Sequence, residues 1–228
     1  MTLLNGPVLF LAPVAILESL QSRLNPLQLS QLMLLPLGMQ AQIPALPPGG
    51  LLISAGHTCL DDYLLSAQWA QAQQWQHVDL ALTGEPQCAA QFGWMLAAGG
   101  THQALSLAAP LLDALAPADR NSWLHAGGPG AASFLALLQL ILMKPLLESW
   151  KIIFPNGKPS PKADLLKLAQ LQTEQWQDIV PLCTRYLILA QDRKHQAFHA
   201  QNCHFNLPAH AEPASSLAQF ILSLTKAN

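Results

Sequence analysis

The chain has 228 residues, of which 51% are hydrophobic and only 11% are charged, and its formal net charge is −2. Globular proteins usually have a charged share of about 25%, so this chain has little charge with which to cover a large surface. We therefore expect part of its surface to be buried between subunits, as in a homodimer. The small negative charge and the lack of any basic run argue against a nucleic-acid partner.

The first 20 residues, MTLLNGPVLFLAPVAILESL, contain a short apolar run that resembles the core of a secretion signal. A signal peptide also needs a positively charged start, whereas the first basic residue here is Arg23. A buried strand followed by a helix is the better interpretation, and we expect a cytoplasmic protein. The cysteines lack the spacing of a metal or redox motif, which is typical of reduced thiols. They are Cys59, Cys88, Cys183 and Cys203.

Strand-like apolar runs alternate with helical patterns over the first 126 residues. Strands are expected at 8–11, 31–35, 51–54, 78–82, 94–97 and 122–125, and helices at 13–24, 61–74 and 101–115. This alternation predicts a parallel α/β sheet, because two parallel strands are joined by a crossover that is usually a helix.

A glycine-rich turn and a long apolar run, together residues 125–150, form the stretch around which the chain is organised. The polar side chains between residues 131 and 147 are only Ser133, Gln139 and Lys144. A helix that is apolar on most sides is surrounded by protein or by lipid. We favour protein, because Pro145 is expected to break the run before the about 20 apolar residues that a membrane span needs.

Four more helices are expected after this central helix, at 162–171, 173–190, 192–203 and 213–224. The predicted fold class is therefore α/β followed by all-α. A sheet domain would occupy residues 1–126, and the central helix with a helical domain would occupy residues 127–228.

Three stretches, in this order, resemble the β-hydroxyacid dehydrogenase family, which includes 3-hydroxyisobutyrate and 6-phosphogluconate dehydrogenases. Leu35-Pro36 followed by PPGGLLISAGHT (47–58) is similar to a Leu-Pro cofactor contact and the strand motif after it. DLALTGEP (79–86) resembles the family's D-A-P-V-S-G-G-P. HAGGPGAASFLALLQ (125–139) resembles the start of the family's interdomain helix. The resemblance implies a shortened Rossmann-like domain, a long interdomain helix and a helical domain that forms a homodimer.

The resemblance also implies where a small molecule and a cofactor would bind. The substrate candidates are Thr83, Gly84, Glu85, His125 and Gly127. The weaker candidates for contact with NAD(P) are Leu35, Pro36 and His57. Open α/β sheets bind ligands at the carboxyl ends of their strands, so residues 83–85 with His57 and His125 could line one pocket. The alternative is that residues 83–85 form a purely structural turn.

The chain departs from the family's pattern at the cofactor-binding loop and at the catalytic positions. Dinucleotide binding uses G-x-G-x-x-G so that the backbone can approach the pyrophosphate, but the stretch here, residues 12–15, reads APVA. The catalytic lysine falls on Ala136, and the asparagine after it falls on Leu140. Lys144 lies about 12 Å further along the helix axis. Glu85 replaces a glycine, and its charge would repel a substrate carboxylate. We therefore expect no bound cofactor and no catalytic residue.

These departures favour a diverged relative without dehydrogenase activity that binds a small ligand or a partner. Two alternatives stay open: an active NAD(P)-dependent oxidoreductase with an atypical cofactor site, and a purely structural dimeric subunit. A zinc site is a further possibility, because one helix face would carry His195, His199 and Cys203. The polar residues around them favour a solvated helix face, so no metal and no membrane contact are expected.

Overall fold

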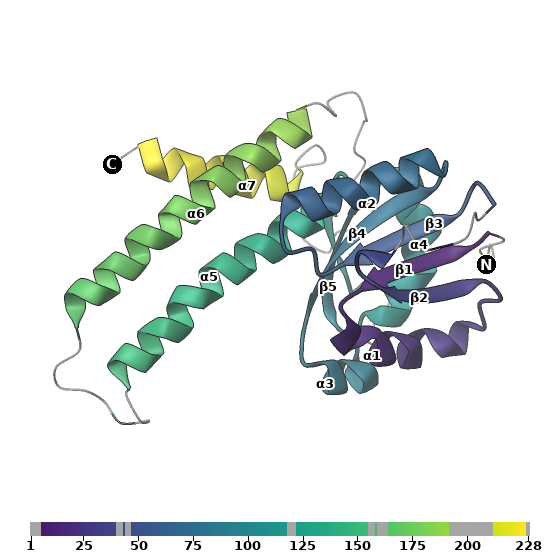
Figure 1. Cartoon of the computed structure of the whole chain (residues 1–228), viewed down its shortest axis with the longest axis horizontal. Coiled ribbons are helices and arrows are strands. Elements are labelled where there is room, and N and C mark those ends of the chain that lie inside the picture. The colour runs from purple at the N-terminus through teal and green to yellow at the C-terminus, as the bar shows by residue number, and fades with distance from the viewer. Residues whose placement is uncertain are drawn as a thin grey trace.

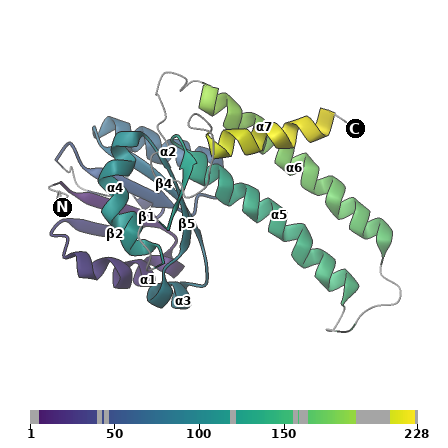
Figure 2. The ribbon, with the colours of Figure 1, turned by 180° about the vertical axis from the view of Figure 1, so that it is seen from behind.

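The computed structural model describes residues 6–39, 43, 47–117, 122–154, 158, 164–191 and 212–226. Within these residues a six-stranded sheet has helices on both faces, and two long helices project away from it as a hairpin (Figures 1 and 2). The predicted fold class, α/β followed by a helical region, is confirmed. The division into domains at residue 126 stays a prediction.

The sheet is mixed, with the strand order β2-β1-β3-β4-β5-β6. Its strands are β1 (Val8–Ala12), β2 (Leu32–Pro36), β3 (Leu51–Ala55), β4 (Gln76–Thr83), β5 (Met95–Gly100) and β6 (Leu124–Gly127). Strands β1 to β4 are parallel, as expected, whereas β5 is antiparallel to β4 and parallel to β6. The β4–β5 connection explains the reversal. It carries only a seven-residue helix, α3 (Pro86–Phe92), which is too short to cross the sheet.

Helices α1 (Val14–Leu24), α3 and α4 (His102–Leu115) cover one face of the sheet, where the largest apolar cluster lies. Helix α2 (Leu60–Ala72) and the first turns of α5 (Ala131–Ile153) cover the other face. Helices α6 (Leu165–Gln191) and α7 (Pro213–Lys226) pack on α5. Thr101 caps α4 as its hydroxyl accepts a hydrogen bond from the Ala104 N–H at 3.1 Å.

Two expected interruptions are wrong. Helix α5 continues through Pro145 to Ile153. Helix α6 is a single helix of 27 residues that contains Pro181, whereas two helices were expected at 162–171 and 173–190. A proline inside a helix costs about 3 kcal/mol, and the packing of α5 against α6 outweighs that cost. Among the described helices, α5 alone has the length and apolar composition of a membrane span, but its first two turns are buried in the protein. The helix expected at 192–203 lies outside the described residues.

A buried carboxylate connects the sheet to α5. Asp79, in the middle of β4, is 1% exposed. Its two oxygens accept hydrogen bonds from the backbone N–H groups of Gly130 and Ser133, both at 2.7 Å. These N–H groups belong to the first turn of α5, where a negative charge is stabilised by the helix dipole. A Cβ atom at Gly99 would lie 2.7 Å from Asp79 Oδ1, so β5 needs a glycine there.

Replacing Asp79 by asparagine should destabilise the protein. The amide NH₂ of Asp79→Asn would face a helix N–H and leave one donor unpaired, at a cost of about 3 kcal/mol. Urea unfolding followed by circular dichroism measures the change. Asp178→Asn, at an exposed position of α6, is the control and should shift the free energy of unfolding by less than about 0.5 kcal/mol. Equal shifts in the two variants would contradict a capping role for Asp79.

Candidate functional site

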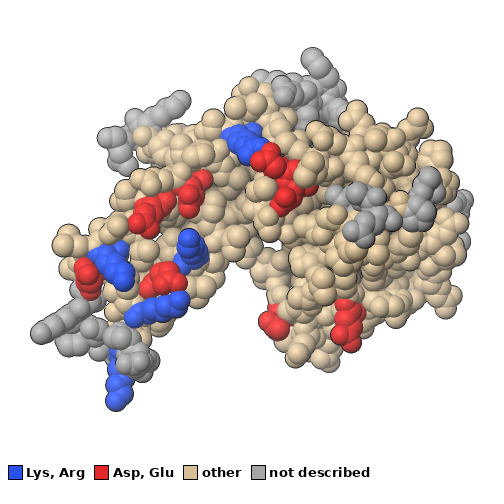
Figure 3. Space-filling view, viewed as in Figure 1, with Lys and Arg blue, Asp and Glu red and all other residues tan. Residues whose placement is uncertain are grey.

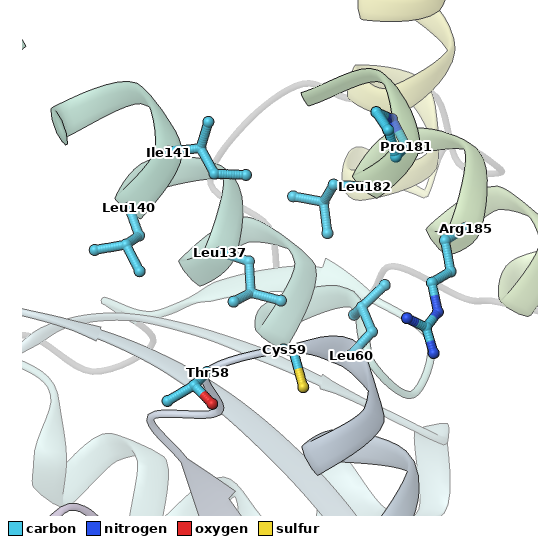
Figure 4. A pocket seen from close by; sticks show the side chains of 9 residues that line it. All are labelled: Thr58, Cys59, Leu60, Leu137, Leu140, Ile141, Pro181, Leu182 and Arg185. Carbon is cyan, nitrogen blue, oxygen red and sulfur yellow. The ribbon is translucent and has the colours of Figure 1, made fainter. Parts of the chain in front are cut away.

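A cavity of about 270 Å³ lies where the start of α2 meets α5 and α6 (Figure 4). Three helices provide its apolar wall, which consists of Leu60, Leu137, Leu140, Ile141, Pro181 and Leu182. Its polar edge consists of Thr58, Cys59 and Arg185. Thr58 follows the carboxyl end of β3 by three residues. The cavity therefore lies beyond the carboxyl ends of the strands, where α/β proteins bind ligands.

The polar groups at this edge are paired with two acidic side chains of α2. The N–H and hydroxyl of Thr58 both donate to Asp62 Oδ2, at 3.0 and 2.5 Å. These hydrogen bonds lower the pKa of Asp62, so its carboxylate is ionised at neutral pH. Arg185 forms an ion pair with Asp61. The cavity therefore combines an apolar wall with charges that already have partners.

A layer of buried polar side chains lies behind the cavity, between the sheet and helices α2 and α5. His57 Nδ1 lies 2.9 Å from the Ser133 hydroxyl, and its ring meets Tyr63 edge to face at 5.9 Å. Tyr63 stacks on His77, whose Nε2 lies 2.7 Å from the Ser54 hydroxyl. Burial lowers the pKa of His57, so its imidazole is neutral at pH 7. The network holds the loop after β3 against α5.

A second carboxylate joins the start of α5 to the last two helices. Glu212 Oε1 accepts hydrogen bonds from the Gly128 N–H and the Tyr186 hydroxyl, both at 2.8 Å, and Oε2 accepts one from Ser215 at 2.5 Å. A Cβ atom at Gly127 would lie 2.4 Å from Glu212. Sequence reasoning missed this cluster because Tyr186 and Glu212 are far from Gly128 along the chain and belong to no recognisable motif.

The predicted substrate residues at the end of β4 and directly after it do not line this cavity. The Thr83 hydroxyl donates to Gln139 Oε1 of α5 at 3.0 Å. Gly84 and Glu85 are exposed, and Glu85 directly precedes α3. A role for these three residues in binding stays a prediction.

His125 and Gly127 lie on β6, which runs opposite to β3 and β4. β5 separates β6 from β4, and the register places His125 beside Ala98, level with Leu80 in the middle of β4. A pocket shared by His57, Thr83 and His125 stays a prediction. Burial lowers the pKa of His125 to about 4, against a hydrogen bond with the Gly127 backbone and the nearby charge of Glu212.

The residues at the β1–α1 turn do not fit a dinucleotide. A Cβ atom at Gly56 would lie 2.4 Å from Pro13 Cγ, so the proline ring fills the space between the ends of β1 and β3. Pro13 also supplies no N–H group, and the Val14 side chain, 71% exposed, projects from the first position of α1. Leu35 and Pro36 lie half-buried at the end of β2, and residues 37–39 include no charged side chain that could hold a ribose.

The α5 positions that the resemblance links to catalysis are apolar. Ala136 is half-buried, while Leu140 contributes to the cavity wall. Lys144 lies in a neighbouring groove with Glu148, Glu174 and Asp178. The described residues contain no group of three side chains able to hold a metal ion. The candidates His195, His199 and Cys203 lie outside the described part of the chain.

Stability should depend on pH through His125. The folded protein takes up a proton at His125 only near pH 4, whereas the unfolded chain does so near pH 6.5. The contribution of neutral His125 is thus complete above about pH 6.5 and is lost as the pH falls toward 4. Relative to His125→Gln, the wild type should lose about 2 kcal/mol of unfolding free energy between pH 7 and pH 4.5. Urea unfolding at both pH values measures this difference, and equal losses in the wild type and in His125→Gln would contradict it.

No protein-family model matches this sequence, and no curated protein sequence matches it. An imine reductase variant from Myxococcus stipitatus, in complex with NAD+, is 15% identical over 98% of this chain and 95% of its own, with a TM-score of 0.51. A reductive aminase from Aspergillus terreus, in complex with NADPH, is 14% identical over 98% of this chain and 94% of its own, with a TM-score of 0.51. A 3-hydroxyisobutyrate dehydrogenase from Salmonella typhimurium is 15% identical over 97% of this chain and 95% of its own, with a TM-score of 0.48. The chain shares its fold with the imine reductase and the reductive aminase.

Proposed function

We propose that this chain is a homodimeric relative of the β-hydroxyacid dehydrogenases that has lost their hydride-transfer activity and binds a small molecule between α2, α5 and α6. The cavity at the carboxyl end of β3 carries this proposal. It lies at the edge of the sheet where ligands bind in this kind of fold, and its wall is apolar.

The loss of activity is inferred from two separate places in the fold. Proton transfer needs a titratable group within hydrogen-bond reach of the substrate, and α5 presents Ala136 and Leu140 where the family has its lysine and asparagine. Pyrophosphate binding needs close approach to backbone N–H groups at the start of α1, and the Pro13 ring lies there against Gly56. A single substitution would not restore both the proton-transfer group on α5 and the pyrophosphate site at the start of α1.

Calorimetric titration with NADPH and NADH tests the loss of the cofactor site. We expect no saturable heat up to about 1 mM of either nucleotide, which corresponds to a binding free energy weaker than about −4 kcal/mol. A cooperative unfolding transition of the same preparation is the control for folded protein. A dissociation constant below about 100 μM, or −5.5 kcal/mol, would contradict the proposal and favour an active oxidoreductase.

The proposal of a homodimer is supported by the kind of surface that α5 exposes. Large apolar side chains are exposed along this helix, at Leu142, Met143, Leu146, Leu147 and Trp150. In Figure 3 few charged side chains lie over the sheet, while most of those visible gather on the α5–α6 hairpin. Obligate homodimers bury 2,000 Å² or more in total and their interfaces are more apolar than other protein surfaces, so a helix that exposes a row of apolar side chains is typical of such an interface.

Light scattering after gel filtration should give a mass of about 49 kDa, twice that of one chain. Leu147→Glu should shift the protein to the monomer mass at micromolar concentration, because a buried unpaired carboxylate is costly at an interface. Leu65→Glu, at a similarly exposed position of α2 (60%, against 56% for Leu147), is the matched control and should stay dimeric. A wild-type protein that elutes as a monomer would refute the homodimer.

A further inference from the structure

We infer that the cavity between α2, α5 and α6 selects a neutral apolar molecule rather than a hydroxy acid, and that Asp61 sets this preference. The inference rests on the proposed function, because it names the ligand class of the same cavity. A volume of about 270 Å³ suits a ligand on the order of ten non-hydrogen atoms at the packing density of protein interiors.

The wall offers a ligand apolar contacts and no unpaired polar group. Leu60, Leu137 and Leu182 come from three different helices and face the same space (Figure 4). Burying an apolar ligand against them is favourable by roughly 25 cal/mol for each Å² removed from water. A charged ligand in the same place would lose its hydration without gaining a partner from the wall.

The charges at the cavity edge disfavour an anion. Arg185, the cation that lines the cavity, is held by Asp61 in an ion pair. An anionic ligand would compete with Asp61 for the guanidinium and would also meet the carboxylate of Asp62, which stays charged while it accepts two hydrogen bonds from Thr58. A neutral ligand leaves the ion pair and these hydrogen bonds intact.

This arrangement assigns Asp61 a role in specificity. Its side chain is not part of the cavity wall, yet it forms an ion pair with the guanidinium of Arg185, which lines the cavity. Replacing the carboxylate by an amide would leave Arg185 able to bind an anion at the cavity edge. Arg185 and Asp61 are both substantially exposed, so the exchange should not disturb the core.

Two ligands with the same eight-carbon chain test the preference: 1-octanol and octanoate, each titrated calorimetrically below its micellar concentration. We expect 1-octanol to bind at least tenfold more tightly than octanoate. If octanoate binds as tightly as the alcohol, the inference is overturned while the proposed ligand site stands. If neither ligand binds to folded protein, the proposed function itself fails.

Leu140→Glu locates the binding site, since Leu140 lines the cavity but is 64% exposed and so is not needed for folding. It should weaken 1-octanol binding at least tenfold, whereas Leu65→Glu, outside the cavity, should leave it unchanged. Equal effects of the two variants would place the ligand elsewhere.

Asp61→Asn tests the residue that sets the preference. It should tighten octanoate binding at least threefold and leave 1-octanol binding unchanged. Glu18→Gln is the matched control, because it removes the same charge from an exposed position of α1, on the opposite face of the sheet. A similar gain in both variants would show that net charge alone is responsible and would overturn the role of Asp61.

Discussion

The position of α5 depends on one buried carboxylate. Asp79 reaches from the middle of β4 to two backbone N–H groups in the first turn of α5. A buried charge is tolerated only when it is well paired, and the helix terminus supplies both hydrogen bonds and a favourable dipole. Gly99 provides the space on the next strand. The rest of the helical region follows from this attachment, since α6 packs on α5 and α7 packs on both.

A second carboxylate, that of Glu212, connects separate elements in the same way as Asp79. Glu212 accepts hydrogen bonds from the turn before α5, from α6 and from α7. Between the two carboxylates, His57 and Ser133 tie the loop after β3 to α5. Apolar contacts are not directional, so the polar contacts decide how the helices are placed on the sheet. That placement forms the cavity, whose wall comes from both the sheet domain and the helical region.

Two places that the resemblance links to chemistry are apolar in this chain. Pro13 lies against Gly56 at the turn where the resemblance would place a dinucleotide. Leu140 lies in the cavity wall where the resemblance would place a polar side chain. Both features agree with the proposed uncharged ligand, since uncharged ligands need shape and apolar contact more than paired charges.

The sequence by itself determined the elements that depend on local pattern. Short, mostly apolar runs of four or five residues placed the six strands, because a buried strand is largely apolar. The helix α3 was not predicted from the sequence, because seven residues are too few to show a helical period. Helix α5 runs through Pro145, and α6 joins the helices expected at 162–171 and 173–190, because packing between α5 and α6 outweighs local preferences.

Only the tertiary structure decided the direction of β5 and β6 and the location of the cavity. The direction of a strand depends on the path of the connection before it, which no pattern of single residues reports. The cavity brings together residues 58–60, 137–141 and 181–185, and its charge balance depends on the contact between Arg185 and Asp61. Those residues are far apart in the sequence, so their chemistry appears only when the sheet edge and the two helices meet.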